Sequence, residues 1–246
     1  MIRKKEAGIY REYESLLDAL GLAKRRDVRV CAVGAGGKTS LLKCLASEYR
    51  QRGIPVAVTT TTHMYAEEKP WFLLEQSREK AAEILSREGV VFLGRPDRDG
   101  KMRAPDEAWM QEILALPFPV LIEGDGARML PLKAPGGREP VIPACATHVL
   151  SVYGMQALGG RMQDVCFRAD LAAGLLGRRP EDPVREEDIA LLAAHPEGGR
   201  KAVPERAACI TVLAQADLPG RMAAAERIGR TVPGEVLLSG RMEDRL

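Results

Sequence analysis

Apolar residues along this chain fall into two alternating patterns. Short runs rich in Val, Ile and Leu between turn residues predict buried strands, and apolar residues spaced by three and four predict amphipathic helices. The predicted strands are 28–33, 55–60, 90–93, 119–122, 147–152, 208–213 and 236–238, and the predicted helices are 6–20, 38–52, 77–88, 105–116, 169–176, 185–194 and 219–228. Asp99-Gly100 predicts a turn between two short extended arms. This alternation predicts an α/β fold with a mostly parallel, doubly wound sheet in a three-layer αβα arrangement.

The length of 246 residues suits one large α/β domain. We therefore expect a single domain over 1–246, with a small sub-domain or insertion around 131–207 as the alternative. Residues 131–143 are rich in Gly and Pro and interrupt the alternation. Long connections of this kind tend to be functional.

The strongest chemical motif is VGAGGKTS at 33–40, between a predicted strand and a predicted helix. Glycines let backbone N–H groups turn towards a phosphate, a lysine adds positive charge, and a Thr hydroxyl is a ligand for Mg²⁺. The motif predicts a fold of P-loop NTPase type with bound ATP or GTP. The residues expected to bind the nucleotide here are Gly34, Ala35, Gly36, Gly37, Lys38, Thr39 and Ser40.

The motif departs from the full pattern GxxxxGK[ST], because Ala32 stands where the first glycine belongs. The shorter G-x-x-G-K-T form resembles the loop of Mur-type ligases. A dinucleotide-binding G-x-G-x-x-G meets Thr39 at its third glycine, which disfavours a Rossmann oxidoreductase. A glycine-rich turn with a surface lysine is the structural alternative.

Two carboxylates, Glu123 and Asp125, follow the predicted strand 119–122. Carboxylates at a strand end of the same sheet normally hold the Mg²⁺ of a nucleotide site. We expect Thr39, Glu123 and Asp125 as metal ligands, with one carboxylate directed at an attacking water or hydroxyl. The alternative is that one of them only caps the turn.

Residues 59–63 read TTTTH and follow the second predicted strand. Thr61 is expected to contact phosphate, and His63 is the histidine best placed for acid–base work or substrate contact. The alternative is a β-branched strand end followed by a surface histidine. Asp217 lies where Asn-Lys-x-Asp reads guanine in GTP-binding proteins, but Ala214 and Gln215 replace the first two letters. A helix cap before Pro219 is the alternative for Asp217.

The composition limits the classes of partner and the location that the sequence predicts for this protein. The formal net charge of +2 argues against electrostatic binding to nucleic acid or to a lipid surface. No apolar run is long enough to span a membrane, and acidic residues occupy the region where a signal peptide needs its apolar core, so a cytoplasmic location is expected. The five cysteines are scattered and never spaced CxxC, which favours reduced thiols. Aromatic residues make up only 4% of the chain, so base preference is expected to be loose.

Six motifs occur in order over almost the whole chain: VGAGGKTS, TTTTH, IEGDGA, PLKAP, EPVIP and QAD. In this order and spacing the chain resembles the YqeC family of selenium-dependent hydroxylase accessory proteins. The resemblance implies a P-loop NTPase-like protein linked to the maturation of molybdenum hydroxylases that carry a selenium-containing cofactor, with such an enzyme or its maturation proteins as partners. It also implies an active face lined by Glu123, Asp125, Arg128, Lys133, Glu139 and Pro140. Arg138 stands where the family usually has a histidine, and only Arg168 remains of a usual His-Arg pair.

The residues of the 127–143 segment also indicate a phosphate site independently of the family resemblance, because Arg128, Lys133 and Arg138 would bring cations close to bound phosphate. The alternative is a solvated basic loop. The leading hypothesis is a Mg²⁺-dependent nucleoside triphosphatase or nucleotide-dependent transferase that uses ATP or GTP, with Lys38, His63, Glu123 and Asp125 as catalytic residues. Two alternatives are a nucleotide-gated protein that delivers a cofactor or docks on a partner, and a Mur-like ATP-dependent ligase or kinase.

Overall fold

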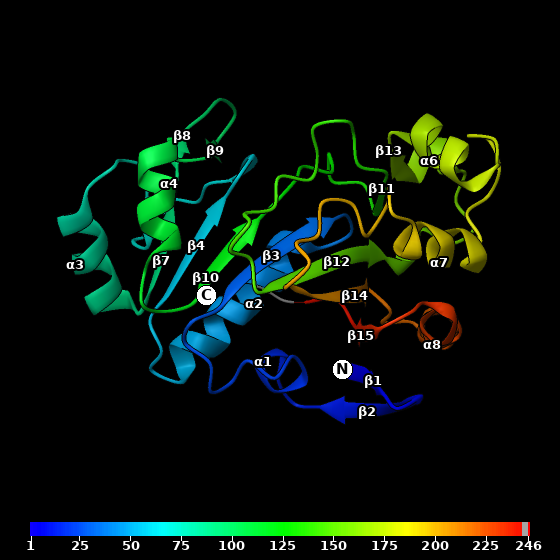
Figure 1. Cartoon of the computed structure of the whole chain (residues 1–246), viewed down its shortest axis with the longest axis horizontal. Coiled ribbons are helices and arrows are strands. Elements are labelled where there is room, and N and C mark those ends of the chain that lie inside the picture. The colour runs from blue at the N-terminus through cyan, green and yellow to red at the C-terminus, as the bar shows by residue number, and fades with distance from the viewer. Residues whose placement is uncertain (243–245) are drawn as a thin grey trace.

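The computed structural model describes residues 1–242 and 246. Its centre is a ten-stranded sheet with the order β2-β1-β15-β14-β12-β3-β10-β4-β7-β6 (Figure 1). All neighbours from β15 to β6 are parallel, and β1 pairs antiparallel with both β15 and β2. The strands are β1 Ile2–Glu6, β2 Ile9–Tyr13, β3 Arg29–Gly34, β4 Val56–Thr60, β6 Phe72–Leu73, β7 Val90–Leu93, β10 Val120–Glu123, β12 His148–Gly154, β14 Ala208–Ala214 and β15 Glu235–Ser239.

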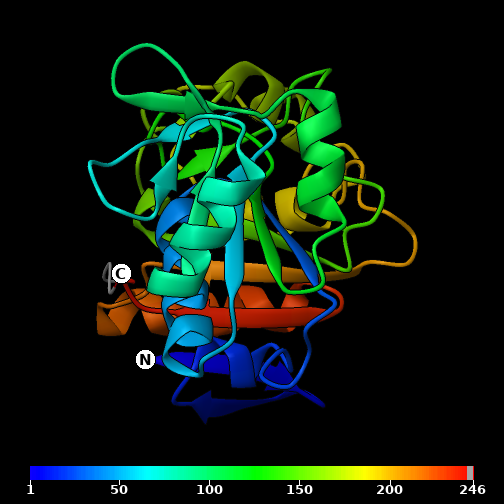
Figure 2. The same cartoon turned by 90° about the vertical axis from the view of Figure 1, so that its left-hand side faces the viewer.

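Helices flank this sheet. They are α1 Leu16–Ala19, α2 Lys38–Gln51, α3 Arg78–Glu88, α4 Glu107–Leu114, α5 Met162–Val165, α6 Ala169–Leu176, α7 Glu186–Ala194 and α8 Pro219–Thr231, with a short 3₁₀ turn η1 at Met155–Ala157. Figure 2 shows α2 and α4 on opposite sides of the sheet, as right-handed parallel crossovers in opposite directions require. The predicted α/β class with a mostly parallel sheet and flanking helices is confirmed, whereas the P-loop NTPase type and the domain boundaries stay predictions.

Two small sheets lie outside the central one. One has the order β5-β9-β8, with β5 at His63–Tyr65, β8 at Arg95–Pro96 and β9 at Lys101–Arg103. The predicted Asp99-Gly100 turn connects β8 and β9, and both of its residues have positive φ. The other pairs β11, Leu132–Lys133, with β13, Cys166–Phe167. This second pair fastens the 131–143 segment to a part of the chain about thirty residues further on.

The predicted helix over 6–20 is wrong. Residues 2–13 form the β1–β2 hairpin, whose two turn residues Ala7 and Gly8 both have positive φ, the conformation of the tightest hairpin turns. Only α1 remains helical, capped by the Ser15 side chain, which accepts from the Asp18 N–H. The hairpin adds to the sheet because β1 pairs with β15 from the far end of the chain.

The remaining predicted helices and main strands are present, with small shifts at their ends. Helix α4, for example, begins at Glu107, and Asp106 is its N-cap, accepting from the Trp109 N–H at 2.9 Å. The strands that carry the site, β3, β4, β10 and β12, are almost entirely buried. No helix in the described part of the chain is long and apolar enough to cross a membrane.

Candidate functional site

The glycine loop, residues 34–37, leaves the sheet at the carboxyl end of β3. Gly34, Gly36 and Gly37 all have positive φ, which residues with a side chain rarely adopt. A Cβ at Gly34 would lie 2.4 Å from the Val152 carbonyl oxygen, and one at Gly36 would lie 2.3 Å from the Gly154 nitrogen. The loop therefore needs glycine for its conformation and for its close approach to β12.

The loop ends at the N-terminus of α2. Its N-cap, Gly37, offers no side chain to the first N–H groups of the helix, and these groups have no acceptor inside the helix. They lie at the positive end of the helix dipole. This combination of N–H donors without a partner inside the helix and the helix dipole is a general binding arrangement for anions such as phosphate.

Lys38 is the first residue of α2 and is only 5% exposed. Its Nζ donates to the Gly34 carbonyl oxygen at 2.6 Å and lies 3.1 Å from Asp125 Oδ1. The Asp125 carboxylate also accepts from the Gly34 N–H at 3.1 Å. Lysine and carboxylate are thus both held against the start of the glycine loop.

Glu123 ends β10, the strand next to β3, and its register partners are Ala32 on β3 and Thr60 on β4. Its Oε2 accepts a hydrogen bond from Thr39 Oγ1 at 2.6 Å. Burial raises the pKa of Glu123, although Lys38 and the Thr39 hydroxyl act in the opposite direction. Two of the expected metal ligands, the Thr39 hydroxyl and the Glu123 carboxylate, are therefore in direct contact.

These groups suit Mg²⁺, which takes oxygen ligands and usually only one or two carboxylates, with phosphate and water completing the set. Thr39, Glu123 and Asp125 supply a hydroxyl and two carboxylates, with Glu123 hydrogen-bonded to Thr39 and Asp125 hydrogen-bonded to the Gly34 N–H. No group of three or more His, Cys, Asp or Glu side chains able to hold a metal occurs in residues 1–242. A metal here would need phosphate oxygens to complete its coordination.

Lys133 on β11 extends the ion pairs away from the loop. Its side chain is fully buried, and its Nζ lies 2.9 Å from Asp125 Oδ2, 2.6 Å from Glu139 Oε2 and 2.6 Å from the Gly126 carbonyl oxygen. Arg168 Nη1 donates to the same Glu139 oxygen at 2.6 Å. We call the chain of side chains Lys38, Asp125, Lys133, Glu139 and Arg168 the ion-pair relay. It joins the loop to the 131–143 segment.

The pKa of Glu139 reflects this position. Partial burial favours its neutral form, but the hydrogen bonds from Arg168 and Lys133 outweigh burial, and the pKa falls below its ordinary value. Glu139 is therefore held as a carboxylate between two cations.

The aromatic ring of Phe167 lies at the end of the ion-pair relay, and the sequence did not identify it as a site residue. Three cations surround Phe167: the guanidinium carbons of Arg168 and Arg128 lie 4.4 Å and 4.9 Å from the ring centroid, and Lys133 Nζ lies 5.7 Å away. Cations at such distances are attracted to the ring face. The only available signal was an aromatic residue next to Arg168 in a chain with few rings.

Thr61, His63 and Asp217, three residues predicted to belong to the site, have no hydrogen bond or ion pair with the Lys38, Thr39 or Asp125 side chains among the described residues. Thr61 Oγ1 donates to the Val141 carbonyl oxygen at 2.8 Å, and its N–H donates to the Glu123 carbonyl oxygen at 3.0 Å, so Thr61 fastens the 139–143 segment to β10. His63 lies on β5 in the small sheet, with its side chain 59% exposed and Nε2 3.2 Å from Asp97 Oδ2. Within the described residues, His63 makes no hydrogen bond or ion pair with the glycine loop.

Asp217 is exposed, and its alternative role as a helix cap is wrong, since Leu218 is the N-cap of α8. Asp217 Oδ1 instead accepts from the Arg241 N–H.

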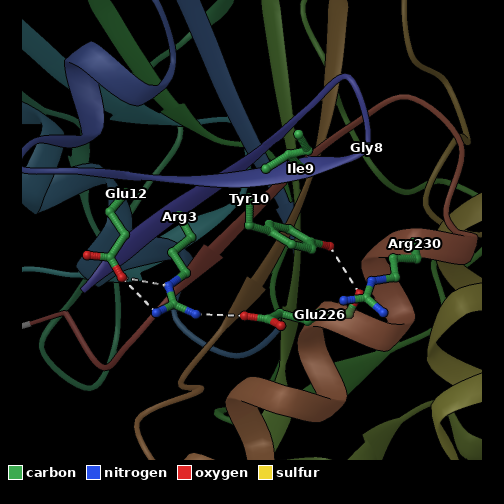
Figure 3. A pocket seen from close by; sticks show the side chains of 7 residues that line it. All are labelled: Arg3, Gly8, Ile9, Tyr10, Glu12, Glu226 and Arg230. Carbon is green, nitrogen blue, oxygen red and sulfur yellow. Dashed lines mark hydrogen bonds and ion pairs between the residues drawn. The ribbon is translucent and has the colours of Figure 1, made fainter.

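A surface hollow of about 450 Å³ lies elsewhere, between the β1–β2 hairpin and α8 (Figure 3). Arg3 in this hollow is already paired with Glu12 and with Glu226, both at 2.6 Å. The Tyr10 hydroxyl donates to the Glu226 carbonyl oxygen. The hollow shares no residue with the glycine loop or the ion-pair relay, so we do not assign the site to it.

Together, the fold and the site define an α/β protein in which a glycine-rich strand–loop–helix unit meets buried carboxylates from the next parallel strand. A family model described as "YqeC protein" matches residues 30–170. The chain is also 34% identical over 197 residues to "Uncharacterized protein YqeC" of Escherichia coli (strain K12), covering 78% of this chain and 77% of that protein. The chain belongs to the YqeC family. No solved structure matches it.

Proposed function

We propose that this protein binds a nucleoside triphosphate, ATP or GTP, together with Mg²⁺ at the glycine loop, and hydrolyses it. The observation that carries the proposal is the contact between Thr39 Oγ1 and Glu123 Oε2 at 2.6 Å, next to a buried lysine at the N-terminus of α2. A hydroxyl, a carboxylate and a lysine in this relation to a helix start are the parts that phosphoryl transfer uses to hold phosphate and metal.

Each residue then has a role. Lys38 neutralises phosphate charge, and the N–H groups of the loop and of the first turn of α2 hold the phosphate oxygens. Thr39 and Glu123 would hold Mg²⁺, which when bound neutralises charge on the phosphates and orients them. Asp125 is the candidate to accept the proton of the attacking water, because it lies beside Lys38 without being the hydrogen-bond partner of Thr39.

A second candidate function is a nucleotide-gated docking or delivery protein with little turnover. The ion-pair relay favours it, because Asp125 contacts both Lys38 and Lys133. A phosphate that draws Lys38 away from Asp125 would leave Lys133 as the remaining lysine on this carboxylate, and it would thereby change the contacts of the 131–143 segment. The relay thus offers a physical connection between phosphate binding and the shape of that segment.

The wider role rests on the family resemblance alone. We propose that the nucleotide step serves the maturation of selenium-dependent molybdenum hydroxylases, with such an enzyme or its maturation proteins as partner. A strain lacking this protein should lose the activity of these hydroxylases and regain it with the wild type but not with Lys38→Ala. Full rescue by Lys38→Ala would separate nucleotide binding from the maturation role.

The direct test measures ATP and GTP binding by calorimetry with and without Mg²⁺, followed by phosphate release. Glu123→Gln and Thr39→Val should weaken the Mg²⁺ dependence of binding, and Asp125→Asn should lower turnover while nucleotide still binds. Normal binding with negligible phosphate release in the wild type would favour the docking function. Phosphate release only with an added small acid and amine would favour a ligase, and formation of nucleoside diphosphate without free phosphate, in the presence of an added alcohol, would favour a kinase. No binding at all would refute the proposal.

A further inference from the structure

The carboxyl ends of β14 and β15 hold polar groups that the phosphate site does not use. These two strands follow β12 in the sheet order, on the side of the glycine loop away from β10. Gln215 directly follows β14 and has a positive φ of 61°. Its Nε2 lies 3.9 Å from the position a Cβ would take at Gly37, and its Oε1 lies 2.9 Å from that position at Gly154. The Gln215 amide therefore lies beside the glycine loop.

Two buried oxygens at this end of the sheet have no hydrogen-bond partner among the described residues. They are Gln215 Oε1 and the hydroxyl oxygen of Ser239, a residue that ends β15 and is 1% exposed. Buried polar atoms normally have a partner in the protein, in water or in a ligand. The other buried side-chain atoms without a partner, in Tyr49, Trp109 and Thr211, lie on α2, on α4 and within β14. Gln215 and Ser239 follow or end neighbouring strands at the carboxyl edge, where ligands of open parallel sheets bind.

Asp217 lies at the same place with its carboxylate fixed. Its Oδ1 accepts from the Arg241 N–H, and the Ala216 N–H donates to the Ser239 carbonyl oxygen at 3.0 Å. Gly240 permits this close approach, because a Cβ there would lie 2.7 Å from Asp217 Oδ1. The ends of β14 and β15 are thus tied together around one exposed carboxylate.

A cavity of about 340 Å³ lies beside the end of β15. It is lined by Ser239, Gly240 and Arg241 together with residues of the β1–β2 hairpin, α1 and α2. The α2 residues in its lining, Cys44, Ser47, Glu48 and Gln51, begin roughly two turns after the start of the helix at the glycine loop.

We propose that the ends of β14 and β15 bind the base of the nucleotide, and that this base is guanine. The inference rests on the proposed function and adds the choice of base to it. Guanine presents two adjacent donors, N1–H and the 2-amino group, which match a carboxylate that only accepts. Adenine presents an amino donor beside an acceptor nitrogen, which a carboxylate meets less well. Asp217 reads the two donors, and Gln215 and Ser239 contact the polar atoms of the base or ribose.

The guanine assignment differs from the loose base preference that the low aromatic content predicts. A chain with few aromatic rings has little capacity to stack on a base, but stacking is not the only means of selection. A fixed carboxylate selects a base through hydrogen bonds instead, and a site built for specific donors strongly rejects ligands that lack them.

The test is calorimetric titration with the Mg²⁺ salts of GTP, ATP and xanthosine triphosphate. The wild type should bind GTP at least about tenfold more tightly than ATP. Asp217→Asn should lower GTP affinity by at least about tenfold and raise affinity for xanthosine triphosphate, whose 2-oxo group accepts from the new amide. This variant keeps the oxygen that accepts from Arg241. Asp170→Asn, at an exposed position of α6, is the matched control and should change neither affinity.

Gln215→Ala should weaken GTP binding while leaving binding of inorganic triphosphate unchanged. Equal affinities for GTP and ATP, unaffected by Asp217→Asn, would overturn the base assignment and leave the proposed function intact. Failure of every nucleotide to bind would overturn both. Thermal unfolding of each variant, matched to the wild type, ensures that a loss of affinity reports on the site.

Discussion

Replacing Lys133 by Met tests whether the buried ion pairs of the relay contribute to the stability of the fold. Its amino group lies within 3 Å of two carboxylates, those of Asp125 and Glu139, and its side chain is fully buried. Removing one partner of a buried pair typically destabilises a protein by about 3–5 kcal/mol. The lower end applies here, about 3 kcal/mol, because Asp125 keeps Lys38 and Glu139 keeps Arg168. For a chain of this size, that corresponds to a fall of roughly 6–12 °C in Tm.

Thermal and urea unfolding measure this effect. Lys80→Met is the matched control, because Lys80 pairs with Glu75 on the surface and both side chains are more than half exposed; it should change stability by less than about 1 kcal/mol. The stability loss of the double variant Lys133→Met/Asp125→Asn should be smaller than the sum of the two single losses, because both substitutions remove the same contact between Lys133 and Asp125. A Lys133→Met variant no less stable than Lys80→Met would refute the claim that the relay is buried and coupled.

Two further predictions concern the loop and the end of the relay. Gly36→Ala should destabilise the fold by about 2 kcal/mol or more and weaken nucleotide binding, because its Cβ would lie 2.3 Å from backbone atoms of β12; Gly53→Ala, with similar positive φ and open space, should cost only about 1 kcal/mol, and equal losses in thermal unfolding would contradict the clash. Glu139 has its folded-state pKa lowered, so it contributes stability above the ordinary value of 4.5 that is lost as pH falls through the folded-state value. The stability difference between the wild type and Glu139→Gln should therefore shrink in urea unfolding from neutral pH to about pH 3, and a constant difference would show that Glu139 is not the titrating group.

The alternation of strands and helices was predictable because it depends on local patterns. Strand β3, the glycine loop and α2 lie almost where the apolar runs and Gly-Lys-Thr place them. The error at 6–20 has a physical reason: Ile9 and Tyr13 are spaced as well for a helix as for one side of a strand. The strand forms because β2 pairs with β1, which in turn pairs with β15. Such pairing over more than two hundred residues is invisible to a local pattern. Gly8 inside the predicted helix was the one contrary signal.

The site was predictable to the same extent. Lys38, Thr39, Glu123 and Asp125 come together because they all lie at the carboxyl ends of two neighbouring parallel strands. Lys133 and Arg168 both contact Glu139 because β11 pairs with β13. No sequence motif predicts that strand pairing. The amide of Gln215 beside the loop depends in the same way on the strand order β14-β12-β3.

Lys38→Ala tests the central claim, that the glycine loop binds nucleotide phosphates. A hydrogen bond from a charged group contributes about 1.5–3 kcal/mol, and 1.36 kcal/mol is tenfold in affinity. Calorimetric titration with Mg²⁺–ATP and Mg²⁺–GTP should therefore show affinity falling at least about tenfold in Lys38→Ala and unchanged in the surface control Lys80→Ala. Equal affinity of Lys38→Ala and the wild type for both nucleotides would contradict the assignment of the glycine loop as the phosphate site.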